Sequence, residues 1–429
     1  MKTQRVNEAN ANASGNISTD TINKHTETLA NHYAKNMKID GFRKGKVPVS
    51  VVKSRYKENL KEESRQKSID EFYTNAIKEL GLEEKEIIGQ PLIVKFDEKD
   101  TGIDIELKIG ITPKFELDNI SSCIPKFELE KVTDKQVEEH INRLAKDRAP
   151  AIESQEKELK EGLIGNINFE GFVDNVAFDG GKAENFDLMI GSKQFIPGFE
   201  ESLIGMQINE EKTIDVKFPE NYQAPNLAGK NAQFKVKLNS IKQKADVKID
   251  DAFAKSIIGK KEENTLEKLK QEVKKDLEKE AKFKLYNEKL KQEVLENISK
   301  TFNFDLPENI IEQEMSVLFN NEVSTLKQEE LESLKKDKEK GKALFEAQRE
   351  KATTSVKVTF IMDKLAKQEK ISVDDNEVFQ TMYYESMMNG QNPQEVIEYY
   401  RKNNLLPAVK MAIIEDRVIT HLLDKNNGF

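Results

Sequence analysis

The sequence predicts an α+β multidomain protein. We expect an N-terminal α+β domain, a central antiparallel sheet with a short helix, and a C-terminal all-α extended helical domain. The 429 residues exceed what one ordinary core holds, so several domains are expected. The period of the apolar residues is two between about 162 and 243 and becomes helical after 245. Charged residues make up 34% and hydrophobic residues 37%, which favours extended elements with much solvated surface.

Two helices and two strands are expected in the N-terminal domain, residues 1–115. One helix starts at Asp20, and a second covers residues 69–80, where the apolar residues fall on one face. That face consists of Ile69, Phe72, Tyr73, Ala76, Ile77 and Leu80. Alternating apolar residues predict strands at 91–96 and 103–111, so a small sheet backs the helices.

An exposed loop follows the first helix at residues 41–48, Gly-Phe-Arg-Lys-Gly-Lys-Val-Pro. Gly41 and Gly45 favour positive backbone angles and Pro48 disfavours a helix at the residue before it, so the loop is not helical. It presents one aromatic residue and three cations: Phe42, Arg43, Lys44 and Lys46. The cations can reach phosphates or carboxylates while the ring stacks or enters an apolar notch. The alternative is a solvated basic turn. Against it stand the exposed aromatic residue and a basic neighbourhood made of Lys38, Lys53, Arg55 and Lys57.

Residues 116–160 are expected to form a linker arm between domains. One helix is predicted there, with Thr133 as N-cap, Gln136 as its capping-box partner and an end before Pro150. The alternative for this segment is a disordered linker.

Three strands of an antiparallel sheet are expected in the central domain, residues 161–244. Apolar and polar residues alternate at 167–173, 214–218 and 232–238. Residues 196–205 predict a short helix across the sheet, with a proline near its start, acidic residues in its first turn and a glycine at its end. The run Phe178-Asp179-Gly180-Gly181 predicts a turn.

The C-terminal domain, residues 245–429, is expected to consist of helices that contact a neighbour on one side only, because their apolar stripes are narrow. Methionines and tyrosine pairs lie in these helices: Met315, Met362, Met382, Met387, Met388, Met411, Tyr383-Tyr384 and Tyr399-Tyr400. Core packing explains most residues of this kind. Flexible methionines on an under-packed scaffold also suit a surface that accepts many apolar partners.

Composition argues against several functions. The net charge of −9 argues against general coating of nucleic acid, and no DNA partner is expected. Cys123 is the only cysteine and the histidines are scattered, so we expect no metal site, no nucleophilic His/Cys site and no cofactor. Gly181-Lys182 ends no P-loop, because Ala183 stands where Ser or Thr is required. Without an apolar leader or an eighteen-residue apolar run, we expect a soluble, unexported protein with no membrane partner.

Prolyl isomerisation needs none of this chemistry, because a pocket that excludes water and accommodates a twisted amide lowers the barrier of about 18–20 kcal/mol. Residues 178–181, the helix start at Ile196 and residues 222–234 resemble an FKBP-type peptidyl-prolyl isomerase domain. The resemblance implies a pocket bordered by Phe169, Phe178, Asp179, Phe186, Ile196, Phe199, Tyr222 and Phe234. In it, the Ile196 N–H would donate to a substrate carbonyl. Phe199 replaces the tryptophan of eukaryotic relatives, which argues against tight macrolide binding. The alternative is that these aromatic residues are ordinary core.

The loop at 41–48 resembles the ribosome-docking signature of bacterial trigger factor, and the order of segments extends the resemblance over the whole chain. It implies a cytoplasmic chaperone at the ribosomal exit tunnel, whose loop contacts the large subunit through protein and rRNA. It further implies helical arms that cradle nascent and unfolded polypeptides, and dimerisation of the free protein. One departure is the stretch 6–17, which is rich in Asn and Ala where the family has a more apolar strand.

Two other functions stay open at this point. One is a dedicated FKBP-type prolyl isomerase whose flanking regions only scaffold or recruit one partner. The other is a purely structural helical adaptor, which would leave the loop and the pocket aromatics unexplained.

Overall fold

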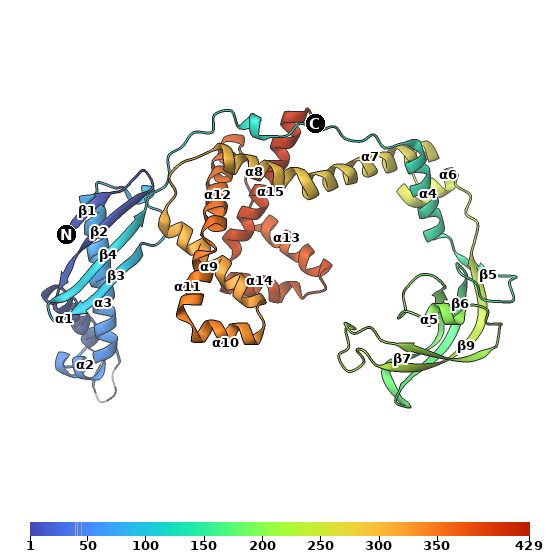
Figure 1. The fold of residues 1–429 in the computed structure, drawn as a ribbon, viewed down its shortest axis with the longest axis horizontal. Helices are drawn as coiled ribbons and strands as arrows, with labels where there is room; N and C mark the ends of the chain where they lie inside the picture. Colours follow the sequence, from blue (N-terminus) through green and yellow to red (C-terminus); the bar gives the residue numbers. More distant parts are fainter. Residues whose placement is uncertain (39, 41, 44) are drawn as a thin grey trace. The chain divides into compact units, whose positions relative to one another are not determined.

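The computed structural model describes residues 1–38, 40, 42–43 and 45–429 (Figure 1). The chain divides into two compact units. One unit consists of residues 1–128 and 285–429, and the other of residues 129–284. Within the described residues, no helix combines the length and the apolarity needed to cross a membrane.

In the described part of the first unit, a four-stranded antiparallel sheet has the order β1-β2-β4-β3. Its strands are β1 (Lys2–Arg5), β2 (Asn10–Ser18), β3 (Leu92–Lys99) and β4 (Gly102–Gly110). β3 and β4 confirm the strands predicted at 91–96 and 103–111. β2 forms where the sequence pattern is least apolar, because the small side chains of Ala11 and Ala13 are fully buried and alternate with half-buried asparagines.

Helices α1 (Thr19–Asn36) and α3 (Lys57–Glu79) pack on this sheet, and α2 (Val49–Arg55) packs on these two helices. A 3-10 turn, Glu84–Glu86, follows α3. α1 starts one residue before the predicted position, where the hydroxyl of Ser18 caps it. α3 confirms the helix predicted at 69–80, but it begins earlier, at Lys57. The first half was not predicted, because its many charged residues obscure the apolar pattern in the sequence. Phe72 of α3 belongs to the same core as Ile105 of β4.

The rest of the first unit is helical. After a π-helical turn, Tyr286–Leu290, come α8 (Lys291–Thr301), α9 (Glu308–Thr325), α10 (Gln328–Lys336), α11 (Lys338–Glu346), α12 (Arg349–Glu369), α13 (Asp375–Met388), α14 (Pro393–Lys402) and α15 (Leu406–Asn427). α8, α12 and α15 share a core that includes Val294, Ile361 and Leu423. Residues 115–127, which include the 3-10 turn Ile120–Cys123, also pack on this core, with Cys123 as a buried filler.

Asn309 joins α9 to the N-terminal sheet. Its side-chain amide donates to the carbonyl of Ile88 at 2.8 Å and to that of Gln90 at 2.9 Å. A Cβ on Gly110 would come within 2.1 Å of the Asn309 Oδ1, so only glycine leaves room for the amide. The sheet is therefore fixed to α9 by side-chain contacts as well as by the chain.

The described residues of the second unit hold a five-stranded antiparallel sheet. Its strands are β5 (Ala151–Glu153), β6 (Ile164–Val173), β7 (Val176–Met189), β8 (Glu211–Lys217) and β9 (Asn231–Lys244). The order is β5-β9-β6-β7, and β8 also pairs with β9. β6, β8 and β9 confirm the three predicted strands, whereas β5 and β7 were not predicted.

The predicted turn at residues 178–181 is wrong, because these residues lie inside β7. β7 pairs with β6 on both sides of the segment, which bulges out opposite Gly171 alone. Two adjacent glycines indicate a turn in the sequence, but here they let the strand bulge and continue.

The helices of the second unit are α4 (Asp134–Arg148), α5 (Phe199–Leu203), α6 (Asp251–Ile258) and α7 (Leu266–Leu285). The predicted capping box between Thr133 and Gln136 opens α4. A disordered linker is wrong for this segment, because Ile141 of α4 packs in one core with Phe253 of α6 and Leu269 of α7.

Candidate functional site

An aromatic cavity of about 420 Å³ lies in the second unit, on the side of the sheet that carries α5. Its walls come from β6, β7 and β9, from the segment before α5, and from the segment between β8 and β9. The lining residues are Phe169, Phe178, Gly180, Gly181, Gln194, Phe195, Ile196, Pro197, Phe218, Pro219, Tyr222 and Phe234. No charged side chain occurs among the described residues that line it, so a bound amide would be separated from water by apolar walls.

The aromatic walls hold one another in place. The Phe178 ring lies 5.8 Å from the rings of both Phe218 and Phe234, edge to face. Phe169 contacts Phe195 in the same way at 5.3 Å. Such pairs contribute about 0.5–1.5 kcal/mol each beyond their burial, so the cavity is formed before any ligand binds.

Two glycines give Phe178 its place in the wall. A Cβ on either Gly171 or Gly181 would come within 2.7 Å of the Phe178 ring. The bulge in β7 therefore places the Phe178 ring over Gly171 and Gly181, where any side chain would collide with it.

The structure brings most of the predicted pocket residues together. Five of the eight line the cavity: Phe169, Phe178, Ile196, Tyr222 and Phe234. Phe199 lies behind the wall, with 0% of its surface exposed and its ring stacked on Phe195 at 4.4 Å. Phe186 lies beside the wall, 5.6 Å from the Phe195 ring, and the exposed Asp179 is not part of the lining.

Sequence reasoning missed several lining residues: Gln194, Phe195, Pro197, Phe218 and Pro219. Phe195 directly precedes the predicted helix start and was available as a signal. The Ile196 N–H has no acceptor within the described residues, whereas the Ile196 carbonyl accepts the N–H of Phe199 at 3.1 Å. A donor in a cavity wall is thus open to a ligand.

A buried carboxylate, Glu200, lies in the first turn of α5. Burial opposes its ionisation, yet hydrogen bonds from the N–H groups of Lys193, Phe195 and Gly191 hold the pKa of this carboxyl below its ordinary value. Sequence reasoning counted Glu200 only among the acids that suit a helix start. The sequence carries no signal of the loop that folds around it.

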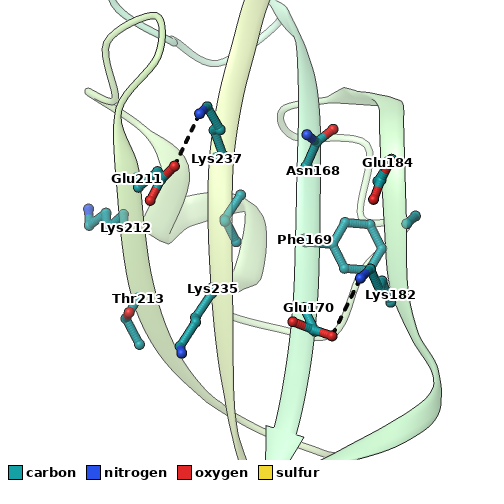
Figure 2. A pocket seen from close by; sticks show the side chains of 12 residues that line it. Asn168, Phe169, Glu170, Lys182, Glu184, Glu211, Lys212, Thr213, Lys235 and Lys237 are labelled. Atoms are coloured by element: carbon teal, nitrogen blue, oxygen red, sulfur yellow. Dashed lines mark ion pairs between the residues drawn. The ribbon is translucent and has the colours of Figure 1, made fainter.

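A larger groove of about 510 Å³ lies on the solvent-facing side of the same sheet (Figure 2). Two ion pairs lie in this groove, Glu170 with Lys182 at 3.7 Å and Glu211 with Lys237 at 3.1 Å. Exposed pairs of this kind are solvated and contribute little energy. The groove cannot exclude water from an amide, so the smaller aromatic cavity is the better candidate site.

The loop at 41–48 is the second candidate site. Phe42 is 39% exposed, and Arg43 and Lys46 are also exposed. Lys44 lies outside the described residues. The described side chains therefore leave an aromatic ring and two cations open to a partner.

Two features of the described residues bear on the end of this loop. Gly45 has a φ of +79°, the backbone angle expected for it. Val47 is buried in one cluster with Val52 of α2, which anchors the end of the loop. The basic neighbourhood is weaker than predicted, because Lys53 forms an ion pair with Glu27 of α1.

The methionines of the helical region fall into two groups. Some are buried in cores and are explained by packing: Met315, Met362 and Met382. Met387 and Met388, at the end of α13, are 58% and 88% exposed. Exposed tyrosines accompany them on α13 and α14: Tyr383, Tyr384 and Tyr399. The ends of these helices thus present apolar surface that no described residue covers.

Three family models match the chain. "FKBP-type peptidyl-prolyl cis-trans isomerase" matches residues 155–239. "Bacterial trigger factor protein (TF)" matches residues 1–144, and "Bacterial trigger factor protein (TF) C-terminus" matches residues 265–424. The sheet and its aromatic cavity therefore belong to an FKBP-type peptidyl-prolyl isomerase domain.

Curated relatives match almost the whole chain. The trigger factor of Helicobacter hepaticus is 49% identical over 424 residues, which cover 99% of this chain and 96% of the relative. That of Wolinella succinogenes is 46% identical and covers 99% of both chains. A solved structure, "Promiscuous Substrate Recognition in Folding and Assembly Activities of the Trigger Factor Chaperone", shares the fold over 100% of both chains, with a TM-score of 0.57 and 21% identity.

The chain belongs to the trigger factor family. It is a ribosome-associated chaperone with an FKBP-type domain, and hence a peptidyl-prolyl cis-trans isomerase. Because both flanks match models of the same family, a dedicated isomerase with merely scaffolding flanks is the weaker account.

Proposed function

We propose that the aromatic cavity is the isomerase active site. Its walls would be Phe169, Phe178, Ile196, Tyr222 and Phe234, with Phe199 supporting them from behind and Phe186 and Asp179 beside them. The observation that supports this most strongly is a preformed cavity of about 420 Å³ without a charged side chain among its described lining residues. Pockets of this size hold small ligands.

The chemistry asked of this cavity is modest. Rotation about an X-Pro bond breaks amide resonance, and the twisted amide is less polar than the planar one, so exclusion of water favours it. The Ile196 N–H would donate to a carbonyl of the bound peptide. Each 1.4 kcal/mol removed from the barrier raises the rate about tenfold, and the uncatalysed step takes tens of seconds. A reduction of the barrier by a few kcal/mol is therefore enough to make isomerisation fast compared with the uncatalysed step.

Truncation of Tyr222 tests the assignment. Tyr222 is 38% exposed, so Tyr222→Ala costs little stability but removes one wall of the cavity. We expect kcat/KM for a proline-containing peptide to fall about tenfold or more. Phe172→Ala is the matched control, because this ring lies in β6 outside the cavity, where Lys235 packs over it at 5.2 Å. Equal activity of both folded variants would refute the assignment.

We propose further that Phe42, Arg43, Lys44 and Lys46 dock the chain on the large ribosomal subunit, touching both protein and rRNA. The exposure of Phe42, Arg43 and Lys46 supports this proposal. The burial of Val47 supports it too, because this apolar contact anchors the end of the loop and leaves Arg43 and Lys46 available to a partner. An rRNA contact would make binding sensitive to salt, because phosphate contacts release counterions.

Residues 245–429 would cradle nascent and unfolded polypeptides. The exposed Met387 and Met388 support this assignment, because flexible apolar side chains adapt to many sequences. We assign residues 1–115 to ribosome binding, 116–160 to a linker arm and 161–244 to the isomerase domain. The cytoplasm is the proposed compartment, with dimerisation of the free protein and no membrane or DNA partner.

A further inference from the structure

We propose that Glu200 is a positioning residue for prolyl isomerisation, whose buried carboxylate fixes residues 191–195 and thereby places Phe195 and Ile196 in the cavity wall. This inference rests on the proposed assignment of the aromatic cavity as the isomerase site. Glu200 itself does not line the cavity.

The carboxylate of Glu200 gathers donors from five successive residues. Its Oε2 accepts the N–H groups of Gly191 at 2.8 Å and Lys193 at 3.1 Å. Its Oε1 accepts the N–H groups of Gln194 at 2.8 Å and Phe195 at 3.3 Å, and the hydroxyl of Ser192 at 3.2 Å. The segment is wrapped around one side chain and ends at the cavity wall.

No cation from the described part of the chain balances this charge. Glu200 is 5% exposed, and within the described residues no Lys, Arg or His nitrogen lies within ion-pairing distance of it. Backbone N–H groups and the Ser192 hydroxyl stabilise the carboxylate, much as in backbone anion nests. Without it, the same N–H groups would be left without their acceptor, and orphaned donors in a partly buried loop are costly.

The conformation of the segment makes it dependent on these bonds. Gly191 has a φ of +93° and Lys193 a φ of +59°, and left-handed backbone is unfavourable for a lysine. The Lys193 N–H is one of the donors to Glu200. The carboxylate therefore holds the segment in a shape that the chain would not adopt by itself.

The neighbouring acid shows that a helix-start effect does not explain Glu200. Glu201 lies in the same first turn of α5, but it is exposed, and among the described residues it accepts a single hydrogen bond, from the N–H of Gly198 at 3.0 Å. Both acids suit the helix dipole equally. Of the two acids, only Glu200 contacts the cavity wall, where the Phe195 ring lies 5.3 Å from that of Phe169.

Two isosteric variants of the full chain test this inference. Glu200→Gln replaces one acceptor oxygen by an NH₂ group that faces donors, whereas Glu201→Gln makes the same change of charge without affecting the segment. We expect Glu200→Gln to lower kcat/KM about tenfold or more and to speed amide hydrogen exchange at residues 191–195. Glu201→Gln should stay within about twofold of the unmodified chain in both measurements.

Wild-type kcat/KM in folded Glu200→Gln would overturn the inference, as would equal losses in the two variants. Should Glu200→Gln fail to fold, Ser192→Ala removes a single donor, and a loss of about threefold is expected from it. Unchanged activity in Ser192→Ala would then count against the inference. Tyr222→Ala distinguishes a failure of the cavity assignment from a failure of the role of Glu200. If Tyr222→Ala and Glu200→Gln both keep full activity, the proposed active site is wrong. If only Tyr222→Ala loses activity, the cavity assignment stands and the role of Glu200 is rejected.

Discussion

Phe199→Ala should act first through the stability of the isomerase domain. The ring is 0% exposed and lies 4.4 Å from that of Phe195 and 5.1 Å from that of Phe234. Removal of a fully buried phenylalanine costs about 3–5 kcal/mol, from lost burial and from the void that remains. A domain of ordinary stability, about 5–15 kcal/mol, would stay folded at low temperature but with a small margin.

The assay combines unfolding and catalysis in the full chain. Hydrogen exchange of β6 and β9 in increasing urea reports the unfolding of this domain alone, and isomerisation is measured at about 10 °C, where the variant is folded. We expect the free energy of unfolding to fall by about 3–5 kcal/mol. Loss of isomerase activity with an unchanged urea midpoint would refute the reasoning, because it would mean that the ring acts on the substrate and not as a support.

Three further predictions follow from burial and charge. Phe199→Trp introduces the only tryptophan of the chain, and the larger ring should lower the free energy of unfolding by about 1–3 kcal/mol. The fluorescence of this tryptophan should change when a proline-containing peptide binds. Unchanged fluorescence at a saturating peptide concentration would contradict a binding cavity next to residue 199. Met387→Ser with Met388→Ser should weaken suppression of client aggregation without changing isomerase activity, and full suppression by this variant would remove α13 from the client surface. Hydrogen bonds from Lys425 and His421 hold the pKa of Glu369 below its ordinary value, so its contribution to stability is present above the unfolded carboxyl pKa and is lost as the pH falls through the folded pKa. Glu369→Gln should therefore destabilise the α12–α15 pair near neutral pH but not in acid, and an equal difference in urea midpoint at both would be inconsistent with this linkage.

The sequence predicted those elements in which buried residues recur with the period of a strand or of a helix. Ile103, Ile105, Leu107 and Ile109 alternate along β4 and are all buried, so strand and inward face follow from the pattern. β7 escaped prediction because its residues are mostly exposed and its glycines indicate a turn. Edge strands with a bulge carry no strong alternation.

The candidate cavity was predictable in part, through aromatic residues in a motif. Phe178 and Phe234 were identified in this way. Phe195 and Phe218 lie outside the motif, so only the folded structure places them in the cavity. Glu200 shows the same limit, because its donors are backbone N–H groups and any residues at those positions would supply them. Such sites depend on loop geometry, which sequence patterns do not encode directly.

Co-sedimentation with large ribosomal subunits tests the central claim most directly. The unmodified chain should sediment with the subunits and dissociate as salt rises, because phosphate contacts release counterions. The triple variant Phe42→Ala, Arg43→Ala, Lys44→Ala should stay in the supernatant while keeping its isomerase activity, since Phe42 and Arg43 are exposed and the isomerase sheet belongs to the other compact unit. Undiminished co-sedimentation of the folded, active triple variant would contradict the docking assignment on which the account of ribosome association rests.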